Sequence, residues 1–200
     1  MHSETQARRA PRQDNRRRQL LDAAAGEFRG RGFHAVTMRD IARSADMIAG
    51  SIYYHFGSKE DLFLAVYEEG VRRISERVSE AVEGAEDPWE RLARACRAHT
   101  GMLLEESDYA QVILRVFPED VSAVRERLVE LRDGYERLFR VLVDDLPLAS
   151  GVDRSTLRRM LLGALNWAKF WYRPGGMPPQ AIADRMLELL KESLVSNEAT

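Results

Sequence analysis

The chain has one cysteine, Cys96, among 200 residues. A single cysteine excludes an internal disulfide framework and a zinc site built from several cysteines. No apolar run approaches the ~20 residues that a membrane-spanning helix needs. The first residues are polar and rich in arginine, without the apolar segment of a secretory signal. We therefore expect a soluble, cytoplasmic protein that does not contact membranes.

Signals of catalysis are equally scarce. The four histidines, His2, His34, His55 and His99, do not have the spacing of a metal-binding motif. No segment alternates between apolar and polar residues as a half-buried strand does, so no glycine-rich phosphate loop can follow a strand. We expect no enzymatic activity, no bound metal and no cofactor.

The charges are divided unevenly along the chain. The first 60 residues contain 11 Lys and Arg against 7 Asp and Glu, whereas the remaining 140 contain 19 against 25. A basic N-terminal part on a mildly acidic body indicates that one end contacts a polyanion. A solvated basic tail is the alternative that charge alone leaves open.

Almost the whole chain has the apolar spacing of amphipathic helices, as in Leu20, Leu21, Ala24, Ala25 and Phe28. Two short helices, at about Met38–Ala45 and Ile48–His55, follow this first one closely. Three helices in this order are typical of a helix-turn-helix unit. The second short helix carries residues that suit a nucleic-acid groove, namely Gly50, Ser51, Tyr53, Tyr54 and His55. A small helical bundle that binds no nucleic acid is the alternative.

The residues Thr37–Ala42, Ala45 and Gly50–Leu62 resemble the DNA-binding signature of the TetR family of transcriptional repressors. The apolar patterns along the chain predict an all-α fold of about nine helices, and the resemblance implies that such a protein is a homodimer. Its expected parts are a basic flexible arm (1–15), a helix-turn-helix domain (16–62) and a ligand-binding and dimerisation domain (63–200). Carried over to this chain, the DNA-binding residues are Thr37, Arg39, Ser51, Tyr53, Tyr54, His55 and Lys59. Two positions depart from the family pattern, because Asp46 replaces a usual glycine and Ile48 replaces a frequent capping serine.

Two C-terminal helices, at about 153–172 and 181–194, are too apolar to be isolated surface helices, which indicates a two-fold dimer contact. The two helix-turn-helix domains of such a dimer would bind the two half-sites of a palindromic operator. The residues expected at the dimer interface are Leu162, Leu165, Trp167, Trp171, Met186 and Leu190.

The stretches Leu162–Trp167 and Trp171–Gly176, together with Tyr54–Glu60, are similar to a subgroup of these regulators that controls fatty-acid or steroid-ring catabolism. The subgroup implies release from the operator by a small-molecule effector, a CoA thioester. A multidrug-efflux repressor that responds to diverse apolar ligands is the alternative. Binding of the effector is expected to shift the connecting helix at about 58–82.

The helices at about 89–105 and 122–143 are expected to enclose the effector. The expected apolar lining is Met102, Leu103, Leu114, Phe117, Leu138 and Phe139, and the expected cation is one of Arg94, Arg97, His99 and Arg115. Each of these residues also has an ordinary interpretation as core or solvated surface. Cys96 lies on the same helix and is expected to be a small buried apolar side chain.

Overall fold

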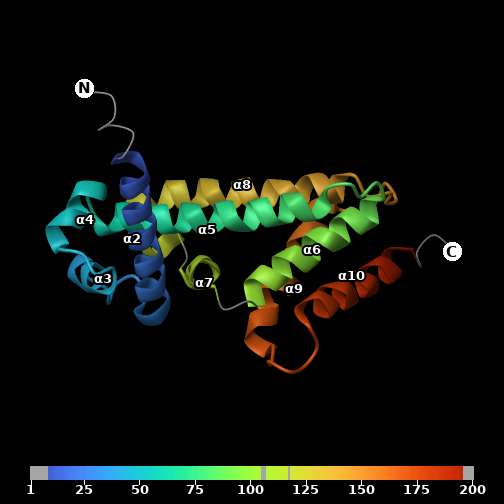
Figure 1. Ribbon diagram of the computed structural model, residues 1–200. Coiled ribbons are helices and arrows are strands. Elements are labelled where there is room, and N and C mark those ends of the chain that lie inside the picture. Colours follow the sequence, from blue (N-terminus) through green and yellow to red (C-terminus); the bar gives the residue numbers. More distant parts are fainter. Residues whose placement is uncertain (1–8, 105–106, 117, 196–200) are drawn as a thin grey trace.

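The computed structural model describes residues 9–104, 107–116 and 118–195, and these residues form nine α-helices (Figure 1). The described residues form no strand, which confirms the expected all-α fold. The helices are α2 (Arg9–Arg31), α3 (Met38–Ser44), α4 (Ala49–His55), α5 (Lys59–Val82), α6 (Pro88–Leu104), α7 (Asp108–Arg115), α8 (Arg125–Asp144), α9 (Arg154–Trp171) and α10 (Pro179–Val195). Two short 3-10 turns, Pro118–Asp120 and Ser122–Val124, precede α8.

The first helix is longer than the sequence indicated. It begins at Arg9 rather than at Arg16, so residues 9–15 are helical and do not form the expected flexible arm. Pro11 does not prevent this start, since a proline in the first turn of a helix breaks no internal hydrogen bond. Residues 1–8 of the expected arm lie outside the described residues.

Local sequence determines the turn between α3 and α4. Thr37 caps α3, because its hydroxyl accepts from the backbone N–H of Asp40 while the Asp40 carboxylate accepts from the backbone N–H of Thr37. Asp46 then turns the chain with φ of +52°, a left-handed conformation that aspartate tolerates better than most residues. Ile48 precedes α4 without a side-chain cap, as its apolar side chain requires.

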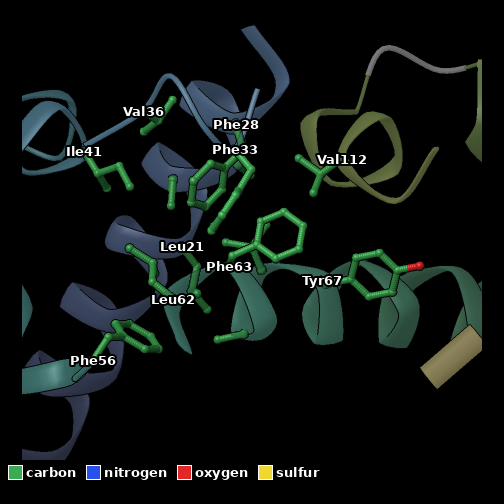
Figure 2. Packing of buried hydrophobic residues seen from close by; sticks show 14 of the residues in the cluster. Leu21, Phe28, Phe33, Val36, Ile41, Phe56, Leu62, Phe63, Tyr67 and Val112 are labelled. Carbon is green, nitrogen blue, oxygen red and sulfur yellow. The ribbon is translucent and has the colours of Figure 1, made fainter. Parts of the chain in front are cut away.

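Two hydrophobic cores hold the helices together. The first packs α2, α3, α4 and the N-terminal half of α5 around Phe28 and Phe63, and it also includes Tyr109 and Val112 of α7 (Figure 2). Leu128 of α8 belongs to this core as well. A division of the chain after residue 62 therefore does not follow the hydrophobic core, because α7 and the start of α8 pack against the N-terminal helices.

The second core lies among α6, α8, α9 and α10, with buried side chains such as Phe139, Leu161 and Leu165. Cys96 is fully buried in it, and burial raises the pKa of its thiol to about 12. This confirms the expected role as a small apolar side chain, because a redox sensor needs an exposed thiol of low pKa. Among the described residues, no helix is both long and apolar enough to cross a membrane.

Candidate nucleic-acid interface and ligand cavity

Helix α4 presents its polar residues to solvent. Ser51, Tyr53 and Tyr54 are exposed, whereas Ile52 on the opposite side is fully buried in the first core. The Tyr54 and His55 rings contact each other edge to face, with centroids 5.3 Å apart. Apart from its chain neighbours and the backbone of its own helix, no atom would lie within 4 Å of a β-carbon placed on Gly50, so the backbone there is open to close approach. The four predicted α4 contacts thus share one accessible end of the molecule, at the left of Figure 1.

Thr37 and Arg39 flank this helix from α3. The Thr37 hydroxyl donates to the Asp40 carboxylate at 2.6 Å, and this bond is the main reason that the pKa of Asp40 falls to about 2. The hydroxyl proton is thus engaged, and a contact of Thr37 with a DNA phosphate, which the family resemblance implies, requires the hydroxyl to turn. Arg39 is exposed and lines a shallow hollow with Arg43 and Ile48, between α3 and α4.

Lys59 makes contacts within the protein that the sequence did not indicate. Its ammonium donates to the carbonyl oxygens of Phe33 at 2.9 Å and Val36 at 3.0 Å, and lies 4.3 Å from the centre of the Phe33 ring. An ammonium has three N–H donors, so one remains for a phosphate. The first role of Lys59 is therefore to hold the loop between α2 and α3, which the sequence did not indicate.

A cavity of about 330 Å³ lies in the body of the molecule. Helices α5, α6, α7, α8 and α9 all contribute to its wall, which is mostly apolar. This volume falls within the range of small-molecule sites. The residues that line it are Tyr67, Gly70, Val71, Ile74, His99, Met102, Leu103, Ala110, Ile113, Leu114, Val116, Arg132, Tyr135, Glu136, Leu162, Gly163, Asn166, Trp167, Lys169 and Phe170.

Three of the six expected lining residues, Met102, Leu103 and Leu114, lie in this wall. Phe139 does not, because its side chain is fully buried in the second core. Leu138 packs against the same core and is also absent from the wall. Both expectations are corrected, since the apolar side of α8 is used for helix packing. Phe117 lies outside the described residues.

The expected cation is not provided by any of the four candidates. Arg94 pairs with Glu90, and Arg97 pairs with Asp184 at 2.6 Å, both away from the cavity. Arg115 instead donates to the carbonyl oxygen of Arg29. Their charges and N–H donors are thus engaged elsewhere, which corrects the prediction for these arginines.

His99 does line the cavity, but as a neutral ring. Burial lowers its pKa to about 4. Its Nδ1 lies 2.6 Å from the Tyr135 hydroxyl and its Nε2 lies 3.2 Å from Oδ1 of Asn166. Because Oδ1 can only accept, we assign the proton to Nε2, so that Nδ1 accepts from Tyr135. The prediction of a cation at His99 is therefore wrong.

The cationic residues of the wall were not expected from the sequence. They are Arg132 on α8 and Lys169 on α9. The Lys169 ammonium donates to the carbonyl oxygen of Leu114 at 3.0 Å. The signal for Asn166 was a polar residue within an apolar stretch, whereas nothing local marks Arg132 among the many arginines of the chain.

Helix α9 exposes a row of large apolar side chains, namely Met160, Trp167, Phe170 and Trp171. Trp167 and Trp171 were expected at a dimer interface, and their exposure is compatible with it. Leu162 and Leu165 are buried within the subunit, and Leu165 has no exposed surface, which corrects that part of the prediction. Met186 and Leu190 on α10 are half-buried against the second core.

Helix α7 joins the cavity to the N-terminal helices. Ala110, Ile113 and Leu114 line the cavity. From the same helix, the Asp108 carboxylate accepts from Arg29 of α2 at 2.8 Å, and the Tyr109 hydroxyl donates to Asp22 of α2 at 2.8 Å. A displacement of α7 by a ligand would therefore act directly on α2. The described residues contain no cluster of potential metal ligands.

The buried His99 makes the stability of the protein depend on pH. The unfolded chain binds a proton at His99 near pH 6.5, whereas the folded protein binds it only near pH 4, so stability decreases as the pH falls through this window. We expect His99 to lower the free energy of unfolding by about 2 kcal/mol between pH 7 and pH 5. Urea unfolding at both pH values measures this, and His99→Gln should remove most of the decrease. An equal decrease in the variant would contradict the assignment.

The comparisons with known proteins agree with this arrangement. Residues 20–66 match the family described as bacterial regulatory proteins, tetR family. Residues 85–194 match the tetracyclin repressor-like C-terminal domain. The HTH-type transcriptional repressor KstR2 of Mycolicibacterium smegmatis is 30% identical over 171 residues, which are 81% of this chain and 82% of that protein.

Two solved structures are similar over most of their length. The superantigen PfiT is 30% identical with a TM-score of 0.76, covering 87% of this chain and 95% of that chain. AibR in complex with isovaleryl coenzyme A and operator DNA is 25% identical with a TM-score of 0.74, covering 87% of this chain and 97% of that chain. The two family matches, one for each half, show that this chain belongs to the TetR family of bacterial regulatory proteins.

Proposed function

We propose that this chain is a transcriptional repressor that binds a palindromic operator as a homodimer and leaves it when a CoA thioester of fatty-acid or ring catabolism occupies the cavity. The observation that carries the proposal is the double role of α7, which lines the cavity and is bound to α2 through Asp108 and Tyr109. The similarity of this chain to the transcriptional repressor KstR2, and to AibR, whose structure contains isovaleryl coenzyme A and operator DNA, supports the proposal.

The exposed side of α4 is the proposed reading surface. Serine and tyrosine hydroxyls bind phosphates and base edges, and a helix of this size fits the major groove of DNA. Arg39 lies beside α4 with an exposed side chain, and arginine pairs well with guanine. Ile48 is 80% exposed at the start of α4 and can contact a thymine methyl group.

The exposed row on α9 is the proposed dimer contact. The Trp167 and Phe170 rings lie 4.3 Å apart and both are more than half exposed. A contiguous apolar patch of this kind on a soluble chain usually marks an interface. Two copies joined there would place two α4 helices on one duplex, as a palindromic operator requires.

The proposed mechanism is a shift between two states of α7. In the unliganded protein the ion pair of Asp108 with Arg29 and the hydrogen bond of Tyr109 with Asp22 hold α2 in its position for DNA. A ligand that needs more room than the cavity offers displaces Ile113 and Leu114, and the displacement changes these contacts. The effector lowers operator affinity only by its preference for the displaced state, and coupling of this kind is typically 5- to 150-fold.

For the reading surface, we expect Ser51→Ala and Tyr53→Ala each to lower operator affinity about tenfold, because a lost base or phosphate contact costs ~1–3 kcal/mol. Both side chains are exposed, so the free energy of unfolding should change by less than ~0.5 kcal/mol. Fluorescence anisotropy with the DNA upstream of the chain's own gene measures the affinity. Ser79→Ala, an exposed serine on α5, is the matched control and should bind normally. Unchanged affinity in both α4 variants would contradict the proposed surface.

For the effector, we expect one or more CoA thioesters to weaken operator binding, while the corresponding free acids do not. In Asp108→Asn this ligand effect should decrease about fivefold, because the variant removes a partly exposed ion pair worth up to ~1 kcal/mol between α7 and α2. Glu76→Gln is the matched control, since it breaks an ion pair with Arg72 inside α5 and should leave the ligand effect intact.

The outcomes separate the alternatives. Release by diverse apolar compounds but by no thioester would favour a multidrug-efflux repressor and contradict the thioester assignment. An undiminished ligand effect in Asp108→Asn would contradict the role of α7.

A further inference from the structure

One hydroxyl at the cavity has no hydrogen-bond partner. Tyr67 of α5 is 1% exposed, and no described residue donates to its hydroxyl or accepts from it. Tyr67 lines the cavity, and Figure 2 shows its oxygen pointing away from Phe63 and the other rings of the first core. A buried hydroxyl without a partner is costly and therefore rare in folded proteins. Its position in the wall indicates that the missing partner is a ligand atom.

Four other polar side chains of the wall already have hydrogen-bond partners. His99 is bonded on both sides, by Tyr135 and by Asn166, and the Lys169 ammonium donates to the carbonyl oxygen of Leu114. A ligand gains little from these groups because they already have partners. Tyr67 is thus a buried residue of the wall whose hydrogen bonding a ligand can complete.

We propose that Tyr67 reads the effector by donating a hydrogen bond to an oxygen acceptor on its acyl part. The cavity then selects acyl groups that carry a ketone or carboxylate oxygen on their carbon skeleton over saturated hydrocarbon groups of the same size. This inference rests on the proposed function for the CoA portion of the ligand. It adds which acyl groups the cavity binds most tightly.

The chemistry of the hydroxyl supports a donor role. Burial raises the pKa of Tyr67 to about 12, so the phenol keeps its proton at neutral pH. The positive charge of Arg132, which also lines the cavity, acts on Tyr67 in the opposite direction. A guanidinium can only donate hydrogen bonds, and its positive field favours an oxygen that carries negative charge. A carbonyl or carboxylate oxygen therefore suits both groups.

The position of Tyr67 places this oxygen on the part of the ligand remote from the coenzyme. Gly163 and Asn166 line the cavity, are exposed and do not belong to the row assigned to the dimer contact, so they mark the open side of the cavity, whereas Tyr67 is buried. A volume of about 330 Å³ corresponds to the lower end of small-molecule sites and cannot enclose the nucleotide of CoA together with an acyl group. The thioester consequently stays toward the open side, and the far end of the acyl group reaches Tyr67.

The test is a direct binding measurement without DNA, so that it does not depend on operator release. Isothermal titration calorimetry compares octanoyl-CoA with 7-oxooctanoyl-CoA and with the mono-CoA thioester of octanedioic acid, all of which have eight acyl carbons. We expect the wild-type protein to bind at least one oxygenated thioester about tenfold more tightly than octanoyl-CoA, the effect of one hydrogen bond to an otherwise unpaired group. If the carboxylate thioester binds most tightly, Arg132→Gln should lower the affinity for this thioester.

Tyr67→Phe should remove this preference and leave octanoyl-CoA affinity unchanged, with a thermal midpoint equal to or above that of the wild type. Tyr135→Phe is the matched control, because it removes a hydroxyl of the same wall that is already bonded to His99. This control should affect all three thioesters equally and keep the preference. A wild type without preference, or a preference that persists in Tyr67→Phe, would overturn the inference.

A second pair of probes separates this inference from the proposed function. If no thioester binds, the thioester assignment fails, and indane and 2-indanone then test Tyr67 alone, since they differ by one carbonyl oxygen. A preference for 2-indanone that Tyr67→Phe removes would support the inference. Equal binding of the two compounds, or binding of neither, would overturn it.

Discussion

Burial of one continuous apolar side of α5 is the constraint on which the rest of the structure depends. Leu62 and Phe63 at its N-terminal end are buried in the first core, and Val78 near its C-terminal end is buried in the second. The helix therefore cannot tilt without disturbing both cores, and protein interiors resist such changes because they are closely packed. We therefore propose that a ligand displaces α7, a short helix bound to α2 partly by polar contacts, rather than α5.

The polar contacts around α7 explain how two distant surfaces can influence each other. Asp108 and Tyr109 bind α2 from one side of α7, while Ile113 and Leu114 line the cavity from the other. Gly70 of α5 keeps the packing tight, since a β-carbon there would lie 2.8 Å from Cδ1 of Ile113. A ligand in the cavity and a duplex on α4 thus act on one connected set of helices. The shift of the connecting helix α5 expected from the sequence stays a prediction, and the contacts of α7 with α2 provide the proposed route.

Local patterns in the sequence predicted the helices and the turn well, because their causes are local. The cap at Thr37, the left-handed Asp46 and the missing cap at Ile48 follow from the residue types at those positions. The buried and exposed sides of α9 were harder to separate, since Leu165 and Trp167 are both apolar and only tertiary packing decides which of them is covered. The link of Lys59 to the carbonyl groups of Phe33 and Val36 also depends on the fold.

The residues of the cavity were harder still to predict from the sequence. Met102, Leu103 and Leu114 could be expected from the helix arrangement that the family resemblance implies, but the bond between His99 and Asn166 joins positions far apart in the sequence. Tyr67 directly follows the stretch that matches the N-terminal family model, residues 20–66, and only the fold shows that its hydroxyl lies at the wall of the cavity. A sequence pattern assigns each residue to a single core or site, so it misses residues that contribute to two of them.

The most direct test of the account is to measure thioester affinity twice, for the free protein and for the protein saturated with operator. Linkage requires that the effector and the operator weaken each other by the same factor. If the cavity and α4 are coupled, the operator-bound protein should bind the thioester less tightly, by the same factor by which the thioester lowers operator affinity. Equal thioester affinities in the two states would contradict the central claim that the cavity controls the DNA-binding helices.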